Sequence, residues 1–156
     1  MTTTPFEIVI VSSDMGSRRY LAEILRKLGF DPISVSTLRG CREILTNGKI
    51  GLVFCDPHVS DGSYKDLLGT DQDRKPRIVL TCRYADWDQH KDARSLGAFA
   101  VISSPCRPTD VDWMVIQARR DEWRLAGQQS SSERLEHMLQ RAELPQNARV
   151  SRVGNK

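Results

Sequence analysis

The sequence predicts an α/β fold in which a doubly wound sheet of five parallel strands is followed by a helical carboxyl-terminal extension. Short apolar runs alternate with amphipathic stretches five times, which is the pattern of strands and covering helices. The third apolar run, at residues 50–55, leads directly into Asp56. In such sheets ligands bind beyond the carboxyl ends of the strands, so Asp56 is the first candidate for a functional residue.

Each predicted strand is an apolar run bounded by turn residues. The strands are expected at residues 6–11, 32–35, 50–55, 77–81 and 99–102. The first run ends in Ser12 and Ser13, and the last ends in Ser103, Ser104 and Pro105. Since the carboxyl ends of parallel strands share one edge of a sheet, these hydroxyls are expected near Asp56.

The predicted helices follow from apolar spacing and capping residues. Leu21, Ile24, Leu25 and Leu28 lie on one face of a first helix that Gly29 ends. A second helix, over 38–45, is capped by Ser36 or Thr37 and closed by Asn47-Gly48. A turn-rich loop at 57–62 precedes a short helix through Tyr64, Leu67 and Leu68. Asp86 is expected to cap a helix over 87–96 that Gly97 ends, and Thr109 to cap the last helix, whose apolar positions are Val111, Met114, Val115 and Ala118.

The chain is expected to comprise one domain at 1–124 and an extension at 125–156. The last helix is expected to fray near Gly127, before a polar linker at 128–132. A second amphipathic helix at 133–143 would carry Leu135, Met138, Leu139 and Ala142 on one stripe. The last dozen residues are predicted to be disordered.

Composition excludes several classes of protein. The 156 residues suit about one domain, and the four cysteines form no Cys-x-x-Cys pair, so a disulfide framework or a zinc ribbon is not indicated. We expect a cytoplasmic protein, since no signal peptide or membrane span is recognisable. Residues 117–156 carry eight basic and five acidic residues, which is the whole net charge of +3. Acidic residues interrupt this basic tail and no helix-turn-helix is visible, so nucleic acid is not the expected partner.

The order of these parts resembles the receiver domain of bacterial two-component response regulators, over roughly residues 6–124. The anchors are Asp56 with Asp61-Gly62 after it, Thr81 ending the fourth strand, Gly97-Ala98, and Ser104-Pro105 closing the fifth. The resemblance implies a flavodoxin-like fold with strand order 2-1-3-4-5. It also implies that Asp56 accepts a phosphoryl group from a histidine kinase with the help of Mg²⁺, and that Thr81 is the switch residue.

The chain departs from the family at three places around this site. Ser12 and Ser13 stand where the family has an acidic pair that binds Mg²⁺, and Ser104 stands where it has a lysine. Asp14 lies one residue beyond the pair and is a weak substitute ligand. The loop after Asp56 is shorter than in the family, which displaces the backbone carbonyl that His58 would offer to the metal. Because losing one preorganised charge costs about 10²–10³ in the rate of such a reaction, we expect weak Mg²⁺ binding and inefficient phosphorylation.

The resulting hypothesis is an atypical, stand-alone receiver-like module without enzymatic activity. It would act through contact with a protein, either a histidine kinase or a downstream signalling protein, or as a homodimer. One alternative is conventional phosphorylation at Asp56. A second is a flavin- or phosphate-binding protein, with residues 12–17 cradling the phosphate. Structural roles also remain open: Asp56 as a carboxylate held by loop amides, Thr81 as an ordinary strand residue, His58 as an exposed loop residue, and Cys55, Cys82 and Cys106 as buried apolar side chains rather than a redox or metal site.

Overall fold

The computed structural model describes residues 6–46, 49–68 and 76–143, without the side chains of 128–137 and 140 onwards. Met1–Arg119 and Arg120–Lys156 form two units. The boundary predicted from the sequence, after residue 124, lies inside the second unit. Asn47-Gly48, predicted to close the second helix, and the last dozen residues, predicted to be disordered, lie outside the described part of the chain.

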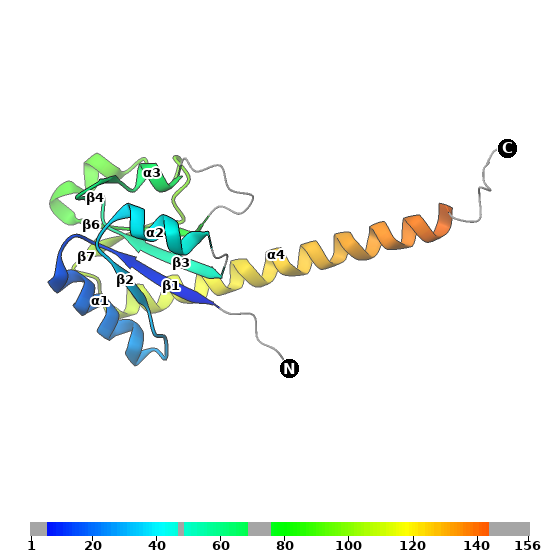
Figure 1. The fold of residues 1–156 in the computed structure, drawn as a ribbon, viewed down its shortest axis with the longest axis horizontal. Helices are drawn as coiled ribbons and strands as arrows, with labels where there is room; N and C mark the ends of the chain where they lie inside the picture. Colours follow the sequence, from blue (N-terminus) through cyan, green and yellow to red (C-terminus); the bar gives the residue numbers. More distant parts are fainter. Residues whose placement is uncertain (1–5, 47–48, 69–75, 144–156) are drawn as a thin grey trace. The chain divides into compact units, whose positions relative to one another are not determined.

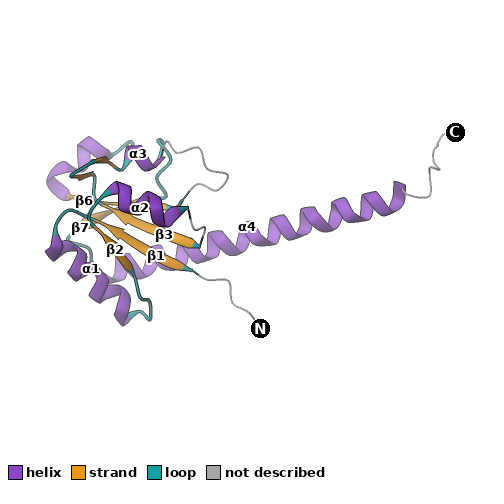
Figure 2. Ribbon diagram, in the orientation of Figure 1, coloured by secondary structure: helices purple, strands orange, loops and turns teal. Residues whose placement is uncertain are grey.

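A five-stranded parallel sheet forms the centre of the first unit (Figures 1 and 2). Its strands run in the order β2-β1-β3-β6-β7, which confirms the predicted order 2-1-3-4-5. In chain order they are β1 (Glu7–Val11), β2 (Ile33–Val35), β3 (Ile50–Cys55), β6 (Ile78–Arg83) and β7 (Ala100–Ser104). The ends of the central strands are aligned: Val11 pairs with Cys55, and Cys82 pairs with Ser103. This register brings the residues that follow each strand to one rim.

Two apolar cores, one on each face of the sheet, bury the alternating strand residues. On one face Ile10 and Phe54 pack with α1 (Met15–Lys27) and the start of α4 (Pro108–Glu143). On the other face Val11 and Cys55 pack with α2 (Leu38–Leu45) and α3 (Lys65–Leu68). Figure 1 shows α1 on one side of the sheet and α2 and α3 on the other.

The loop predicted at 57–62 contains a small antiparallel hairpin. Its strands are β4 (His58–Val59) and β5 (Gly62–Ser63). Between them, the Asp61 carboxylate accepts the backbone amides of Leu38 and Arg39, at 2.8 and 3.0 Å, and so caps α2 from outside the helix. Thr37 also caps α2 by accepting the Gly40 amide at 3.0 Å, which resolves the choice between Ser36 and Thr37.

The α-helix predicted over 87–96 is wrong. The segment forms a 3₁₀ helix, η1 (Tyr84–His90), followed by turns that end at Gly97, whose φ is +117°. Asp86 is not its cap, because its carboxylate accepts two bonds from the Arg83 guanidinium at 3.0 and 3.1 Å. Only His90 and Ala93 are buried between residues 84 and 97, so little packing favours a full α-helix over tighter turns.

The predicted break of the last helix near Gly127 is also wrong. Helix α4 continues from Pro108 to Glu143, through the expected linker at 128–132. Gly127 lacks the positive φ of a helix-terminating glycine, and one glycine inside a helix costs only about 1 kcal/mol relative to alanine. Thr109 is not the cap, because the helix begins one residue earlier, at Pro108, where proline suits the first turn.

Candidate functional site

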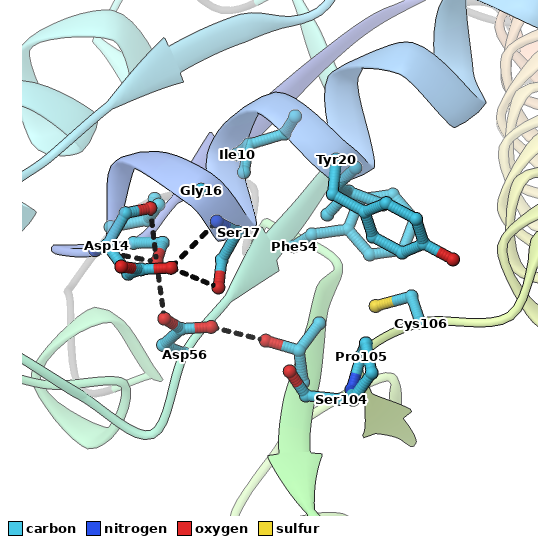
Figure 3. Close-up of a pocket in the computed structure, with 14 residues that line it drawn as sticks. Ile10, Asp14, Gly16, Ser17, Tyr20, Phe54, Asp56, Ser104, Pro105 and Cys106 are labelled. Atoms are coloured by element: carbon cyan, nitrogen blue, oxygen red, sulfur yellow. Dashed lines mark hydrogen bonds between the residues drawn. The ribbon is translucent and has the colours of Figure 1, made fainter.

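Asp56 lies at the carboxyl end of β3, on the rim where the sequence placed it. Its backbone amide donates to the carbonyl of Val11 at 3.0 Å, which fixes the residue beside the end of β1. Ser12 follows β1, Thr81 lies within β6, two residues before its end, and Ser104 ends β7; all three line the same cavity as Asp56 (Figure 3). The fold therefore brings these predicted site residues together from four strands.

Both carboxylate oxygens of Asp56 accept hydrogen bonds from hydroxyl groups. Ser12 Oγ donates to Oδ2 at 2.5 Å, and Thr81 Oγ1 donates to Oδ1 at 2.7 Å. Ser12 is 2% exposed and Thr81 is 4% exposed, so both bonds are shielded from water. Bonds between an ionised acceptor and a hydroxyl are short and strong, so they hold the carboxylate in one orientation.

The segment after β1 is occupied by local hydrogen bonds. Ser13 Oγ accepts the backbone amide of Ser60 at 3.0 Å, which ties this segment to the hairpin. Asp14 caps α1, because its Oδ2 accepts both the amide and the hydroxyl of Ser17 at 2.8 Å. These bonds lower the pKa of Asp14. A metal ion at Asp56 would have to compete with this cap for the Asp14 carboxylate.

His58 lies on β4, exposed, and its ring contacts a residue that the sequence analysis did not single out. That residue is His90, whose ring centroid is 5.7 Å from that of His58 and also 5.7 Å from that of Tyr64. His90 is 5% exposed and its Nδ1 atom has no hydrogen-bond partner. No signal in the sequence marked it, since it lies in the stretch where an ordinary helix was expected.

Two adjoining hollows meet at Asp56. The first, of about 250 Å³, lies between α1, the ends of β1, β3 and β6, and the segment after β7. The second, of about 560 Å³, extends towards His58, Arg83 and His90. Figure 3 shows Asp14, Ser17 and Asp56 on one side of the first hollow, with Tyr20 and Cys106 on the other. No cluster of three or more metal-ligating side chains occurs among the described residues.

The four cysteines are free and buried. Cys55 and Cys82 belong to one core and Cys106 to the other, on opposite faces of the sheet. Burial raises the pKa of Cys41 to about 11 and that of Cys106 to about 12, and it raises the pKa of Cys55 further. Thiols in this state are poor nucleophiles and poor metal ligands, which fits buried apolar side chains.

Of the comparisons with known proteins, the one with solved structures bears on the fold. No protein-family model matches the sequence, and no curated protein is significantly similar to it. Among solved structures, a response regulator receiver domain protein from Clostridium thermocellum superposes with a TM-score of 0.70 at 18% identity, covering 76% of this chain and 98% of that one. The receiver domain of an HD domain-containing protein from Pseudomonas fluorescens gives 0.66 at 19% identity, covering 86% and 96%.

A third example is the amino-terminal receiver domain of a two-component response regulator from Bacteroides fragilis. It superposes with a TM-score of 0.64 at 21% identity, covering 73% of this chain and 96% of that one. No helix in the described part of the chain is long and apolar enough to cross a membrane. With the sheet order and the rim position of Asp56, these matches show that residues of the first unit adopt the fold of response-regulator receiver domains.

Proposed function

We propose that this chain is a receiver-like signalling module of the two-component type that acts mainly by binding protein partners, with Asp56 phosphorylated poorly. The carrying observation is that hydroxyls from Ser12 and Thr81 hold both oxygens of Asp56, at 2.5 and 2.7 Å. Among the described residues that line the first hollow, the other carboxylate is that of Asp14, and it is engaged as the cap of α1. The output is binding rather than catalysis, to a histidine kinase or a downstream signalling protein.

The chemistry of phosphoryl transfer supports this proposal. A carboxylate attacking a phosphoryl group needs positive charge to offset the like charges, usually from Mg²⁺ and a basic side chain. Ser12 and Ser104 supply hydroxyls to the hollow instead, the Ser13 hydroxyl accepts the Ser60 amide, and Asp14 serves as the cap of α1. Thr81 donates a hydrogen bond to Asp56. A group bound at Asp56 would therefore alter this bond and act through Thr81 on the loop after β6.

The test is labelling of the purified chain by acetyl phosphate with Mg²⁺, followed by intact mass. We expect little or no phosphorylated protein, and a clear rise in the triple variant Ser12→Asp, Ser13→Asp, Ser104→Lys, because it supplies the missing charges. Asp56→Asn in the triple background serves as the control and should remove the label. Strong labelling of the unmodified chain would instead support conventional phosphorylation at Asp56.

The flavin or phosphate alternative receives less support. The amide of Ser17 at the start of α1 already donates to Asp14 Oδ2 at 2.8 Å. The carboxylate occupies the place at the helix terminus that a phosphate would take, and its charge repels an anion. A bound flavin in the protein purified from its native source would restore this alternative.

A further inference from the structure

The hollow of about 250 Å³ beside Asp56 has walls of two chemical kinds. One wall is polar and contains the Asp56 carboxylate with surrounding hydroxyls. The opposite wall is apolar and comes from β1, α1, β3 and the segment after β7. The polar wall includes Ser12, Ser17, Asp56, Thr81 and Ser104; the apolar wall includes Ile10, Tyr20, Leu21, Phe54 and Cys106. Figure 3 shows this separation, with Tyr20 and Phe54 facing the side opposite Asp56.

The charge in this hollow is entirely negative. Among the described residues that line it, the only charged side chains are Asp14 and Asp56. Within the described ranges, no lysine, arginine or histidine forms an ion pair with Asp56. Arg83, which reaches the adjoining hollow, is bound to Asp86 at 3.0 Å. The hydroxyls of Ser12 and Thr81 orient Asp56, and the guanidinium of Arg18 donates to the Ser12 carbonyl at 2.6 Å rather than to the Asp56 carboxylate.

We propose that this hollow binds a small organic monocation, with an ammonium group against Asp56 and an apolar body against Tyr20 and Phe54. An ammonium carries three donors, and the Asp56 carboxylate and the Ser104 hydroxyl offer acceptors on one wall. The volume lies just below the usual range of about 300–1,000 Å³ for ligand pockets, so the ligand is small. The inference depends on the cavity and its charge, and not on the signalling role.

A monocation fits this site better than a divalent metal ion. Mg²⁺ requires near-octahedral oxygen ligands, usually with one or two carboxylates. Asp14 is occupied as the cap of α1, which leaves Asp56 as the carboxylate of the lining that does not cap a helix. An ammonium needs only one carboxylate, and the apolar wall supplies affinity that a hydrated metal ion cannot use.

The experiment is a titration followed by nuclear magnetic resonance, without Mg²⁺ and without phosphodonor, using four probes. Benzylammonium carries both charge and an apolar ring, benzyl alcohol has the ring alone, methylammonium has the charge alone, and benzoate has the opposite charge. We expect benzylammonium to bind about tenfold more tightly than benzyl alcohol, because a charge-assisted hydrogen bond is roughly twice as strong as a neutral one. It should also bind about tenfold more tightly than methylammonium, because the ring adds apolar contact, and benzoate should not bind. Equal binding of benzyl alcohol and benzylammonium would overturn the proposal.

Two variants locate the site. Asp56→Asn keeps the side-chain size and should remove the preference for benzylammonium over benzyl alcohol, whereas Asp112→Asn, at an exposed position of α4 outside the hollow, should keep it. Ser104→Lys places an ammonium on the wall itself and should also abolish the preference. It covers the case in which Asp56→Asn fails to fold. A preference that survives in either folded variant would contradict the assignment. Because no phosphoryl group is involved, failure here leaves the labelling test unaffected.

Discussion

The hydroxyl and carbonyl of Ser12 organise the hydrogen bonds around Asp56. Its Oγ donates to Asp56 at 2.5 Å, accepts the Asp14 amide at 3.1 Å, and its carbonyl accepts the Arg18 guanidinium at 2.6 Å. This network makes Ser12 a structural partner of Asp56 in the folded chain. It places a neutral donor where a metal-binding site would need a second negative charge.

Weak Mg²⁺ binding is the first expected consequence. Of the two carboxylates among the described residues that line the hollow, Asp56 is bonded to two hydroxyls, and Asp14 would have to leave its helix cap to assist. Calorimetric titration of the purified protein should show no submillimolar Mg²⁺ site. An Asp56→Asn variant should give the same flat titration. Submillimolar affinity that disappears in this variant would contradict the prediction.

His90 gives a second residue-scale prediction, on pH. Desolvation of its buried ring, with smaller contributions from His58 and Lys65, lowers its pKa, while Asp86 acts in the opposite direction. The unfolded chain takes up this proton near pH 6.5, and the folded chain only at lower pH. The free energy of unfolding should therefore fall as the pH falls below about 6.5, and level off below the folded pKa.

Thermal unfolding measured between pH 7.5 and pH 5 tests this expectation. His90→Phe keeps an aromatic ring against Tyr64 and removes the titrating group, so its melting temperature should depend less on pH over this interval. His58→Gln is the comparison variant: it removes only one of the smaller contributions to the lowered pKa of His90, so most of the pH dependence should remain. An identical pH dependence in wild type and His90→Phe would show that His90 is not responsible.

At the scale of elements, the hairpin of β4 and β5 connects the rim site to α2. Asp61 accepts two amides at the start of α2, which lowers its pKa, and Ser60 donates to Ser13 in the segment after β1. Gly62 has a φ of +148°, and an added Cβ would meet the Asp66 carboxylate and lie 2.8 Å from Leu38 Cδ1. Asp61 is therefore needed to cap α2, and Gly62 is needed for the positive φ and the close contacts of the turn.

Gly62→Ala should destabilise the first unit by about 1–3 kcal/mol, because both the positive φ and the contacts with Asp66 and Leu38 oppose a side chain. Gly127→Ala is the matched control. Gly127 lies inside α4 without a positive φ and with no atom within 4 Å of an added Cβ, so alanine should be neutral or stabilising by up to about 1 kcal/mol. Chemical denaturation of both variants measures the difference. Equal stability of the Gly62→Ala variant and wild type would contradict the strained-turn account.

At the scale of the whole molecule, both units carry exposed aromatic residues on α4. Trp113, in the first unit, is 54% exposed, and Trp123, in the second, is 81% exposed. Large exposed tryptophans are characteristic anchors of protein interfaces. In the second unit, Met138 and Leu139 from the predicted stripe are also exposed. The side chains of Leu135 and Ala142, the other two residues of that stripe, lie outside the described part of the structure.

We predict that the carboxyl-terminal part of α4 packs against a second copy of the chain or another protein. Trp123, Met138 and Leu139 are exposed on this part of the helix, and exposed apolar side chains favour a partner. For the dimer version, light scattering should show a dimer for the full chain and a monomer for a truncation after Gly127. For the partner version, a pull-down with the truncated chain should lose a protein that the full chain retains. Identical monomeric masses together with unchanged partners would contradict both versions.

The sequence by itself determined the sheet and its rim. Apolar runs of strand length and the turn residues between them predict the strands and their burial, and the resemblance to receiver domains implied their order, so Asp56, Thr81 and the serines were expected near one rim. Tertiary structure decided what depends on partners distant in sequence: the bonds of Ser12 and Thr81 to Asp56, the capping of α2 by Asp61, and the burial of His90. It also decided the continuous α4, because the weak preference of Gly127 to end a helix yields to backbone hydrogen bonding. It decided the turns of η1 as well, because the Arg83 guanidinium binds the Asp86 carboxylate that was expected to cap a helix.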